Sequence, residues 1–207
     1  MNDDEARNWL TDHLGVSRET IDRLQQYLGL VSEAQADQNL VGAATLTNFW
    51  FRHIVDSAQL ILHGQAGSWL DIGSGAGLPG IVIGVVTGSP VTLVEPRSRR
   101  AAFLTSVVEK LKLHNVVVIS STIQKMVGAA FDNITARALA PFPAIIEMAM
   151  PVAHKTTVWV LPKGKTAQSE LASLPRTWQG DWQAVASVTD PASKILVGRH
   201  IRVSGKR

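Results

Sequence analysis

Trp-Leu-Asp-Ile-Gly-Ser-Gly-Ala-Gly-Leu-Pro-Gly, residues 69–80, is the stretch that decides the fold of this chain. The apolar run that ends at Asp71 predicts a strand. The glycines at 73, 75 and 77 predict a loop that bends through positive φ and lets a ligand approach the backbone closely. Pro79 suits the first turn of a helix, which the apolar segment 80–86 continues. The stretch therefore predicts a strand, loop and helix that hold a nucleotide cofactor.

Two kinds of cofactor compete for this loop. Residues 75–80 fit the G-x-G-x-x-G pattern of dinucleotide-binding proteins, but the match starts two residues late. A carboxylate at Asp71 repels a pyrophosphate and attracts the ammonium group of S-adenosylmethionine. Glu95 ends the next apolar run, 91–94, where an acid can accept hydrogen bonds from both ribose hydroxyls. The pattern D-x-G-x-G-x-G is similar to motif I of class I methyltransferases, so we favour the methyl donor over a dinucleotide and over a plain tight turn. The predicted cofactor-binding residues are Asp71, Gly73, Gly75, Gly77 and Glu95.

The composition is that of an ordinary globular protein without cysteine chemistry. The 207 residues are 45% hydrophobic and 18% charged, which predicts one domain, residues 1–207. The lack of cysteine excludes disulfides, cysteine-ligated zinc, iron–sulfur clusters and covalent methylation at pyrimidine C5. The six histidines are scattered, so we expect no metal. No apolar stretch approaches a membrane span and segment 3–5 is acidic, so we expect a cytoplasmic protein without a signal peptide.

The order of the predicted elements defines the fold class. Residues 1–64 read as an N-terminal helical extension, with Ser17 capping its second helix and a further helix over about 46–62. The apolar face of the first two helices comprises Trp9, Leu10, Leu14, Ile21, Leu24 and Leu28. Strands are predicted at 68–72, 91–95, 115–120, 132–136 and 156–161, separated by helices that include 98–112 with Ser98 as N-cap. Segments 182–188 and 195–203 flank a turn and predict an antiparallel hairpin. We therefore expect an α/β fold of the class I S-adenosylmethionine-dependent methyltransferase type, Rossmann-like, with a mostly parallel seven-stranded sheet, an antiparallel C-terminal hairpin and a cofactor-binding core at 65–207.

Basic residues gather in three places on a chain whose net charge is +3. The first two groups directly follow predicted strands and are placed to rim a cleft. Solvated surface charge is an equally favoured interpretation of the same residues. The groups are Arg97, Arg99 and Arg100; Lys163 and Lys165; and Arg199, Arg202, Lys206 and Arg207.

Motifs outside the glycine loop match one family over nearly the whole chain. Arg52-His53-Ile54-Val55-Asp56-Ser57 precedes the loop, and Leu78-Pro79-Gly80-Ile81 ends it. In these motifs the chain resembles the RsmG (GidB) family of bacterial 16S rRNA guanine-N7 methyltransferases. The R-H-I-x-D-S block is far more specific than the glycine pattern alone. Further matches are Asn39-Leu40, Phe131-Asp132, Ala136-Arg137-Ala138, Lys163-Gly164, Glu170-Leu171 and Arg199-His200-Ile201.

The resemblance implies an activity and a partner. It implies methyl transfer from S-adenosylmethionine to N7 of a guanosine in the decoding-region loop of 16S rRNA, with the 16S rRNA or the small ribosomal subunit as partner. It places cofactor contacts on Gly73, Leu78, Ile123, Gln124 and Arg137. RNA contacts are expected from Arg97, Arg100, Lys163, Lys165 and Arg199.

Two stretches depart from the family pattern. Thr122-Ile123-Gln124 replaces the usual Arg-Ala-Glu, which puts any role of those two charged side chains in doubt. Backbone contacts to adenine can survive this change. Residues 34–38, Ala-Gln-Ala-Asp-Gln, lack the family's Trp-Asn and Lys, which makes the N-terminal face less basic.

The chemistry of a guanine N7 target requires no catalytic acid or base. N7 carries an in-plane lone pair and no proton, so catalysis rests on holding it in line with the methyl group. The Asp/Asn-Pro-Pro-aromatic motif of amino-group methyltransferases is absent after the fourth strand, where residues 136–142 read Ala-Arg-Ala-Leu-Ala-Pro-Phe. Arg137 and Lys163 are positioning candidates for the cofactor carboxylate, guanine O6 or phosphates.

Three polar residues before the glycine loop are supporting candidates. His53 and Asp56 lie three residues apart and so on one helical face. Either they pack against the cofactor loop or touch RNA, or they form a local polar contact that fixes the extension to the core. The same two interpretations apply to Asn39.

Other functions remain open on the sequence. A methyltransferase of a small molecule predicts an apolar lid and a less basic rim. A non-catalytic rRNA-binding assembly factor has no physical reason to retain Asp71 and Glu95. A nicotinamide dehydrogenase is disfavoured by Asp71 and by the lack of a catalytic acid–base pair. No extra apolar stripe is evident, so we expect a monomer.

Overall fold

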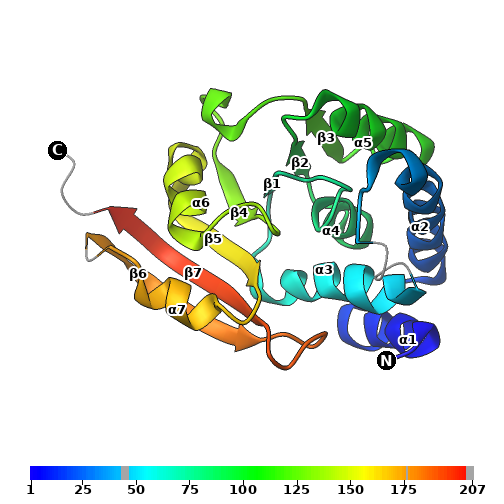
Figure 1. Ribbon diagram of the computed structural model, residues 1–207, viewed down its shortest axis with the longest axis horizontal. Helices are drawn as coiled ribbons and strands as arrows, with labels where there is room; N and C mark the ends of the chain where they lie inside the picture. Colours follow the sequence, from blue (N-terminus) through cyan, green and yellow to red (C-terminus); the bar gives the residue numbers. More distant parts are fainter. Residues whose placement is uncertain (43–46, 176, 204–207) are drawn as a thin grey trace.

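Within residues 1–42, 47–175 and 177–203, which the computed structural model describes, seven strands form one sheet (Figure 1). The strand order is β3-β2-β1-β4-β5-β7-β6. Strands β1 to β5 are parallel, and β7 runs antiparallel to both of its neighbours. The strands are β1 (Trp69–Ile72), β2 (Val91–Val94), β3 (Val116–Ile119), β4 (Phe131–Thr135), β5 (Ala153–Lys163), β6 (Trp178–Ala186) and β7 (Lys194–Val203). The predicted α/β fold with a final antiparallel hairpin is confirmed.

Helices cover both faces of the sheet (Figure 1). Alternate strand residues point to opposite faces, so Trp69 packs with α4 and α5 while Leu70 and Ile72 pack with α6. The helices of the α/β part are α4 (Gly80–Thr87), α5 (Ser98–Lys110), α6 (Phe142–Ala149) and α7 (Ala167–Ala172), with short 3₁₀ turns η4 (Ile123–Lys125) and η5 (Met150–Val152). Because β1 to β5 are parallel, their carboxyl ends lie on one side of the molecule. This is the side at which α/β folds bind ligands.

The helical extension shares the core of the α/β part. Helices α1 (Asp3–Leu14) and α2 (Arg18–Gln38) contribute Trp9, Leu10 and Leu24 to the same hydrophobic cluster as α4 and α5. Ser17 caps α2 as predicted, because its side chain accepts a hydrogen bond from the Thr20 N–H. The division of the chain near residue 64 stays a prediction. No helix in the described part of the chain is both long and apolar enough to cross a membrane.

The helix predicted over 46–62 has a different pitch in the structure. It consists of a π-helix η2 (Trp50–Val55), one α-turn α3 (Asp56–Ala58) and a 3₁₀ helix η3 (Gln59–His63), and its predicted first residue lies outside the described residues. Val55 and Ala58 are buried together with Trp50 and Ile54, so the buried face is wider than one 3.6-residue stripe. The segment is therefore helical as predicted, and the structure adds that its pitch is not that of an α-helix throughout.

Three predicted helix boundaries also differ. Arg97, without a side-chain capping hydrogen bond, holds the N-cap position of α5, so Ser98 is the first helical residue and not the cap. The helix ends at Lys110 instead of 112, because Lys112 has a positive φ of 53°. Pro79 likewise occupies the N-cap position of α4 and not its first turn.

Candidate active site

The glycine loop leaves β1 and is open to a ligand at one point. The N–H groups of Gly73 and Ser74 both donate to Val94 O, which ties the loop to the end of β2. Gly75 has φ 56°, and a Cβ placed there would meet only Arg100 Nη1 and Gly73 O, each at 3.8 Å. The space over Gly75 is therefore open to a ligand that approaches the backbone.

Asp71 lies beneath this loop and is fully buried. Its Oδ2 accepts a hydrogen bond from the Gly80 N–H at 3.0 Å, while Oδ1 is buried and has no partner among the residues that the structure describes. Burial raises the pKa of this carboxyl to about 6, against the opposing effects of the Gly80 hydrogen bond and the Arg137 charge. An unpaired buried carboxylate oxygen is costly, so a cationic ligand group or a linking water fits at Oδ1.

Glu95 lies at the end of β2 and is 3% exposed. Its Oε2 accepts from the Gly75 N–H and its Oε1 from the Arg97 N–H, each at 2.9 Å. These bonds hold the carboxylate beside the open side of Gly75. Each oxygen retains acceptor capacity, so the arrangement suits a ligand with two neighbouring hydroxyls.

The remaining predicted cofactor contacts differ in what they can offer. Leu78 and Ile123 are 4% and 5% exposed, and their side chains belong to the hydrophobic core. A cofactor contact from either would therefore come from the backbone. The Gln124 side chain is exposed, in the turn η4 that follows β3.

Tyr27 was missed by sequence reasoning. Its hydroxyl donates to Ala76 O at 2.8 Å, across 49 residues, and the side chain is fully buried. The tyrosine thereby ties helix α2 to the glycine loop. In the sequence it follows the spacing of Leu24 and Leu28 and is indistinguishable from a core aromatic residue.

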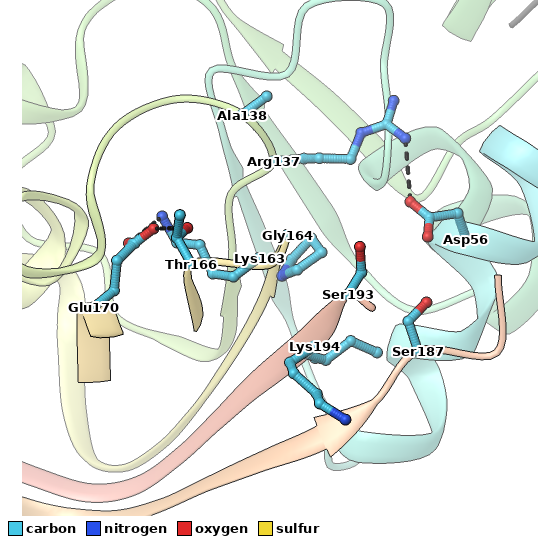
Figure 2. A pocket seen from close by; sticks show the side chains of 12 residues that line it. Asp56, Arg137, Ala138, Lys163, Gly164, Thr166, Glu170, Ser187, Ser193 and Lys194 are labelled. Carbon is cyan, nitrogen blue, oxygen red and sulfur yellow. Dashed lines mark hydrogen bonds and ion pairs between the residues drawn. The ribbon is translucent and has the colours of Figure 1, made fainter. Parts of the chain in front are cut away.

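Arg137 follows β4 and brings His53 and Asp56 into the site. Its Nη1 lies 3.5 Å from Asp56 Oδ2 (Figure 2). The same nitrogen lies 3.4 Å from His53 Nδ1. Burial, followed by the charges of Arg137 and Arg52, lowers the pKa of His53 to about 4. His53 is therefore neutral near pH 7, and its Nδ1 can accept from the Arg137 guanidinium.

Lys163 ends β5 and is engaged with groups of its own chain. Its Nζ lies 3.0 Å from Glu170 Oε2 and donates to Ala140 O at 2.7 Å. The same Glu170 oxygen accepts from the Phe142 N–H, at the start of α6. Lys163 and Glu170 together hold the segment 140–142, and a phosphate contact by Lys163 stays a prediction.

A cavity of about 330 Å³ opens beside Arg137 (Figure 2). Its size is at the lower end of the range for small-molecule sites, about 300–1,000 Å³. A second cavity of about 230 Å³ shares Asp56 and Arg137 with the first as lining residues. It is also lined by Arg52, His53 and Thr189. The larger one is lined by Asp56, Arg137, Lys163, Glu170, Lys194 and Ile195, among others.

The segment 137–140 separates this cavity from the glycine loop. Ala138, with φ 53°, lines the cavity, and the Leu139 side chain lies against Gly73 on the other side. A Cβ on Gly73 would come within 2.7 Å of Leu139 Cδ1. The loop and the cavity are therefore neighbouring sites that share one wall.

The structure brings most of the predicted RNA-binding residues to this edge of the sheet, but not all. Arg97 is exposed, and Arg100 is half-buried near Gly75. Lys165 is exposed between Gly164 and Thr166, which line the cavity. Arg199 is five residues along β7 from Lys194, or about 17 Å away, towards the amino-terminal ends of the parallel strands. There it donates to His63 O at 3.0 Å. Lys206 and Arg207 lie outside the described residues.

Two further predictions concern Asn39 and metal ions. Asn39 ends α2 in a left-handed conformation, φ 46°, with an exposed side chain. Its supporting role stays a prediction. Among the described residues, no group of three or more His, Cys, Asp or Glu side chains is arranged to hold a metal ion.

Comparison with known proteins identifies similar sequences over the whole length. The model of a family described as GidB, rRNA small subunit methyltransferase G, matches residues 20–200. The chain is 40% identical to the ribosomal RNA small subunit methyltransferase G of Zymomonas mobilis, over 97% of this chain and 95% of that one. It is 38% identical to the protein of the same name from Jannaschia sp., over the full length of both.

Solved structures show the same fold at low identity. MtNAS in complex with MTA and tNA aligns with a TM-score of 0.59 and 18% identity, over 96% of this chain and 82% of that one. A SAM-dependent methyltransferase from Aquifex aeolicus aligns with a TM-score of 0.53 and 16% identity, over 72% of this chain and 90% of that one. These likenesses bear on the fold alone.

Proposed function

The chain belongs to the rRNA small subunit methyltransferase G (GidB) family, and we propose that it transfers a methyl group from S-adenosylmethionine to N7 of a guanosine in 16S rRNA. The observation that carries the proposal is the shared wall between the glycine loop and the cavity beside Arg137. Methyl transfer needs donor and acceptor in adjoining sites, and the segment 137–140 touches both. A ribosomal substrate implies a cytoplasmic site of action.

The loop residues fit the methyl donor. Asp71 Oδ1 would face its ammonium group directly or through a water, and Glu95 would accept from its ribose hydroxyls. The open backbone at Gly75 leaves room for the nucleoside. When bound, S-adenosylmethionine supplies an electrophilic methyl group on a sulfonium.

The cavity residues fit an acceptor that needs no deprotonation. Guanine N7 has a lone pair and no proton, so no side chain has to act as a base. Arg137 and Lys163 are donors at the cavity wall, and a donor is useful at guanine O6, a phosphate or the cofactor carboxylate but not at the attacking nitrogen. The chain's contribution is therefore orientation and exclusion of water.

The direct test is methylation of small ribosomal subunits that lack their native modifications. Labelled S-adenosylmethionine is supplied, and the rRNA is digested and analysed by nucleoside. We expect label in 7-methylguanosine at one position. Cofactor binding without rRNA labelling would overturn the proposal in favour of a small-molecule acceptor.

Replacing Glu95 with Ala is expected to weaken S-adenosylmethionine binding by about tenfold to a hundredfold, because charge-assisted hydrogen bonds to the ribose are lost. The freed N–H groups of Gly75 and Arg97 lie at the open side of the loop and can bind water, so the fold is retained. Isothermal titration calorimetry measures the affinity and circular dichroism the melting temperature. Glu109→Ala, an exposed change on α5, is the matched control. Wild-type affinity in Glu95→Ala would refute the ribose assignment.

Replacing Arg97 with Gln is expected to weaken RNA binding most at low salt and to reduce the slope of log K against log salt by about one. The side chain is exposed at the carboxyl edge of the sheet, next to the cofactor loop. Arg199→Gln, towards the other edge, is expected to leave the slope unchanged. Filter binding to the small subunit at several salt concentrations measures both. Equal slopes for the wild-type protein and Arg97→Gln would remove Arg97 from the RNA interface.

A further inference from the structure

The turn between β6 and β7 contacts the short helix α3, which begins at Asp56, across about 130 residues of sequence. Thr189 Oγ1 donates to Asp56 Oδ1 at 2.5 Å, and Gln59 Nε2 donates to the same oxygen at 3.1 Å. Thr189 is 8% exposed and Gln59 is 2% exposed. A buried hydroxyl that donates to a carboxylate forms a charge-assisted hydrogen bond, which is stronger than a neutral one.

The turn is itself held in place by several hydrogen bonds. Gln59 Oε1 accepts from the Val188 N–H at 2.9 Å, and its Nε2 also lies 3.1 Å from Ser187 Oγ. Ser187 Oγ accepts from the Thr189 N–H at 3.2 Å and lies 2.9 Å from Thr189 Oγ1. The position of the Thr189 hydroxyl is therefore fixed by the backbone and by two neighbouring side chains.

The two oxygens of Asp56 have different partners. Oδ1 accepts from Thr189 and Gln59. Oδ2 faces Arg137 (Figure 2). The χ2 angle of an aspartate is soft, so an unrestrained carboxylate can rotate and change which oxygen meets the guanidinium. Both contacts of Arg137 use Nη1, and within the described residues its Nε and Nη2 remain available to a ligand. A rotation of Asp56 would therefore move the donors that Arg137 presents to the cavity.

We propose that Thr189 is a positioning residue for methyl transfer, which acts by fixing the Asp56 carboxylate and through it the Arg137 guanidinium at the wall of the acceptor cavity. The inference rests on the proposed function. It assigns a role in the reaction to the C-terminal hairpin, whose turn lies beside the site (Figure 1). Its strand β6 is the last in the sheet, and β7 lies between β6 and β5. Thr189 touches no substrate in this role and acts only through Asp56.

The test is Thr189→Val, with Thr189→Ser as the conservative variant. Val keeps the shape and removes the hydroxyl. We expect kcat on small ribosomal subunits to fall by about tenfold, as the loss of one hydrogen bond to a charged group implies, while Kd for S-adenosylmethionine changes less than twofold. Thr189→Ser retains the hydroxyl and is expected to restore most of kcat.

Thr157→Val is the matched control for a merely structural effect. Thr157 is a buried threonine, 1% exposed, whose Oγ1 donates to Phe131 O at 2.7 Å, six residues along β5 from Lys163. We expect this variant to lower the melting temperature at least as much as Thr189→Val, with kcat within twofold of wild type at an assay temperature well below melting.

A double-mutant cycle locates the effect. In an Asp56→Asn background, Thr189→Val is expected to reduce kcat by less than twofold further, because the carboxylate that it positions is gone. The inference would be overturned if the kcat losses of Thr189→Val and Asp56→Asn multiplied in the double mutant. It would also be overturned if Thr189→Val had the wild-type kcat, or if Thr157→Val lost as much kcat as Thr189→Val. If the wild-type protein does not label the subunit, the proposed function fails and the inference fails with it. An active wild type with an equally active Thr189→Val refutes the inference alone.

Discussion

Replacing Asp71 with Asn is expected to make the ligand-free protein more stable and to remove most of its affinity for S-adenosylmethionine. Burial raises the pKa of Asp71 from 3.8 to about 6, so ionising this group in the folded state at pH 7 costs about 3 kcal/mol. Asn keeps an acceptor for the Gly80 N–H and carries no charge. Its amide nitrogen would be left without a partner, which offsets part of the gain, so a net stabilisation of about 1–2 kcal/mol is expected.

The pH dependence of this gain has a definite sign. The pKa of Asp71 is higher in the folded than in the unfolded state, so the protonated carboxyl contributes stability. This contribution is fully present below about pH 4 and is lost as the pH rises through 6. His53 acts in the opposite direction. Its pKa is lowered to about 4, so the stability associated with its neutral form is present above about pH 6.5 and is lost as the pH falls through 4. The two effects oppose each other in wild type, and only the difference between wild type and Asp71→Asn isolates Asp71.

Urea unfolding at pH 4 and pH 7.5 measures that difference. The advantage of Asp71→Asn should be present at pH 7.5 and should largely vanish at pH 4. Calorimetric titration at pH 7.5 should show an affinity loss of a hundredfold or more, since a buried carboxylate that faces an ammonium is worth several kcal/mol. Asp12→Asn removes the same charge from an exposed position of α1 and should change neither quantity. A variant that is less stable than wild type at pH 7.5, or that binds the cofactor normally, would contradict this account of Asp71.

Local sequence signals were sufficient for the sheet and for the cofactor loop. The acid at the end of β1, the glycines and the second acid at the end of β2 each lie within a few residues of the element that positions them. Parallel strands then bring Asp71 and Glu95 to one edge without further information. The basic residue after β4 was predictable in the same way, because Arg137 interrupts an apolar run at the strand's end.

What the sequence could not show are contacts between distant segments. The Tyr27 hydroxyl meets Ala76 O only because α2 packs on the loop, and Thr189 meets Asp56 only because β7 inserts between β5 and β6. The engagement of Lys163 with Glu170 is hidden for a similar reason, since a basic residue after a strand reads equally well as a phosphate ligand. The π-helical turn at Trp50–Val55 has no single-residue signal at all.

Replacing Arg137 with Gln is expected to lower kcat/KM for methylation of the small subunit by about a hundredfold to a thousandfold. Losses of this size follow when a preorganised donor is removed from a reacting site. Arg137→Lys is expected to recover little. In the guanidinium, Nη1 is held by Asp56 and His53, and the nitrogens Nε and Nη2 remain as donors for a ligand. The lysine ammonium is a single point charge and cannot make both sets of contacts. Stability should fall by only about 1 kcal/mol, since the Asp56–Arg137 pair is partly exposed and Asp56 keeps Thr189 and Gln59 as partners.

The His53 imidazole gives this prediction a readout that does not depend on activity. Arg137 is one of the charges that hold the pKa of His53 down, after burial, so this pKa should rise in Arg137→Gln and stay near 4 in wild type. NMR titration of the imidazole protons measures it directly. Arg23→Gln, an exposed change on α2, should alter neither the pKa nor the rate.

A raised His53 pKa with an unchanged rate would show that Arg137 lies where the structure places it but takes no part in the reaction. An unchanged pKa together with an unchanged rate would remove Arg137 from the site altogether. Only a raised His53 pKa together with a lower rate supports the proposed role. In that role the guanidinium is held by Asp56 and His53 on one side and acts on the substrate with the other.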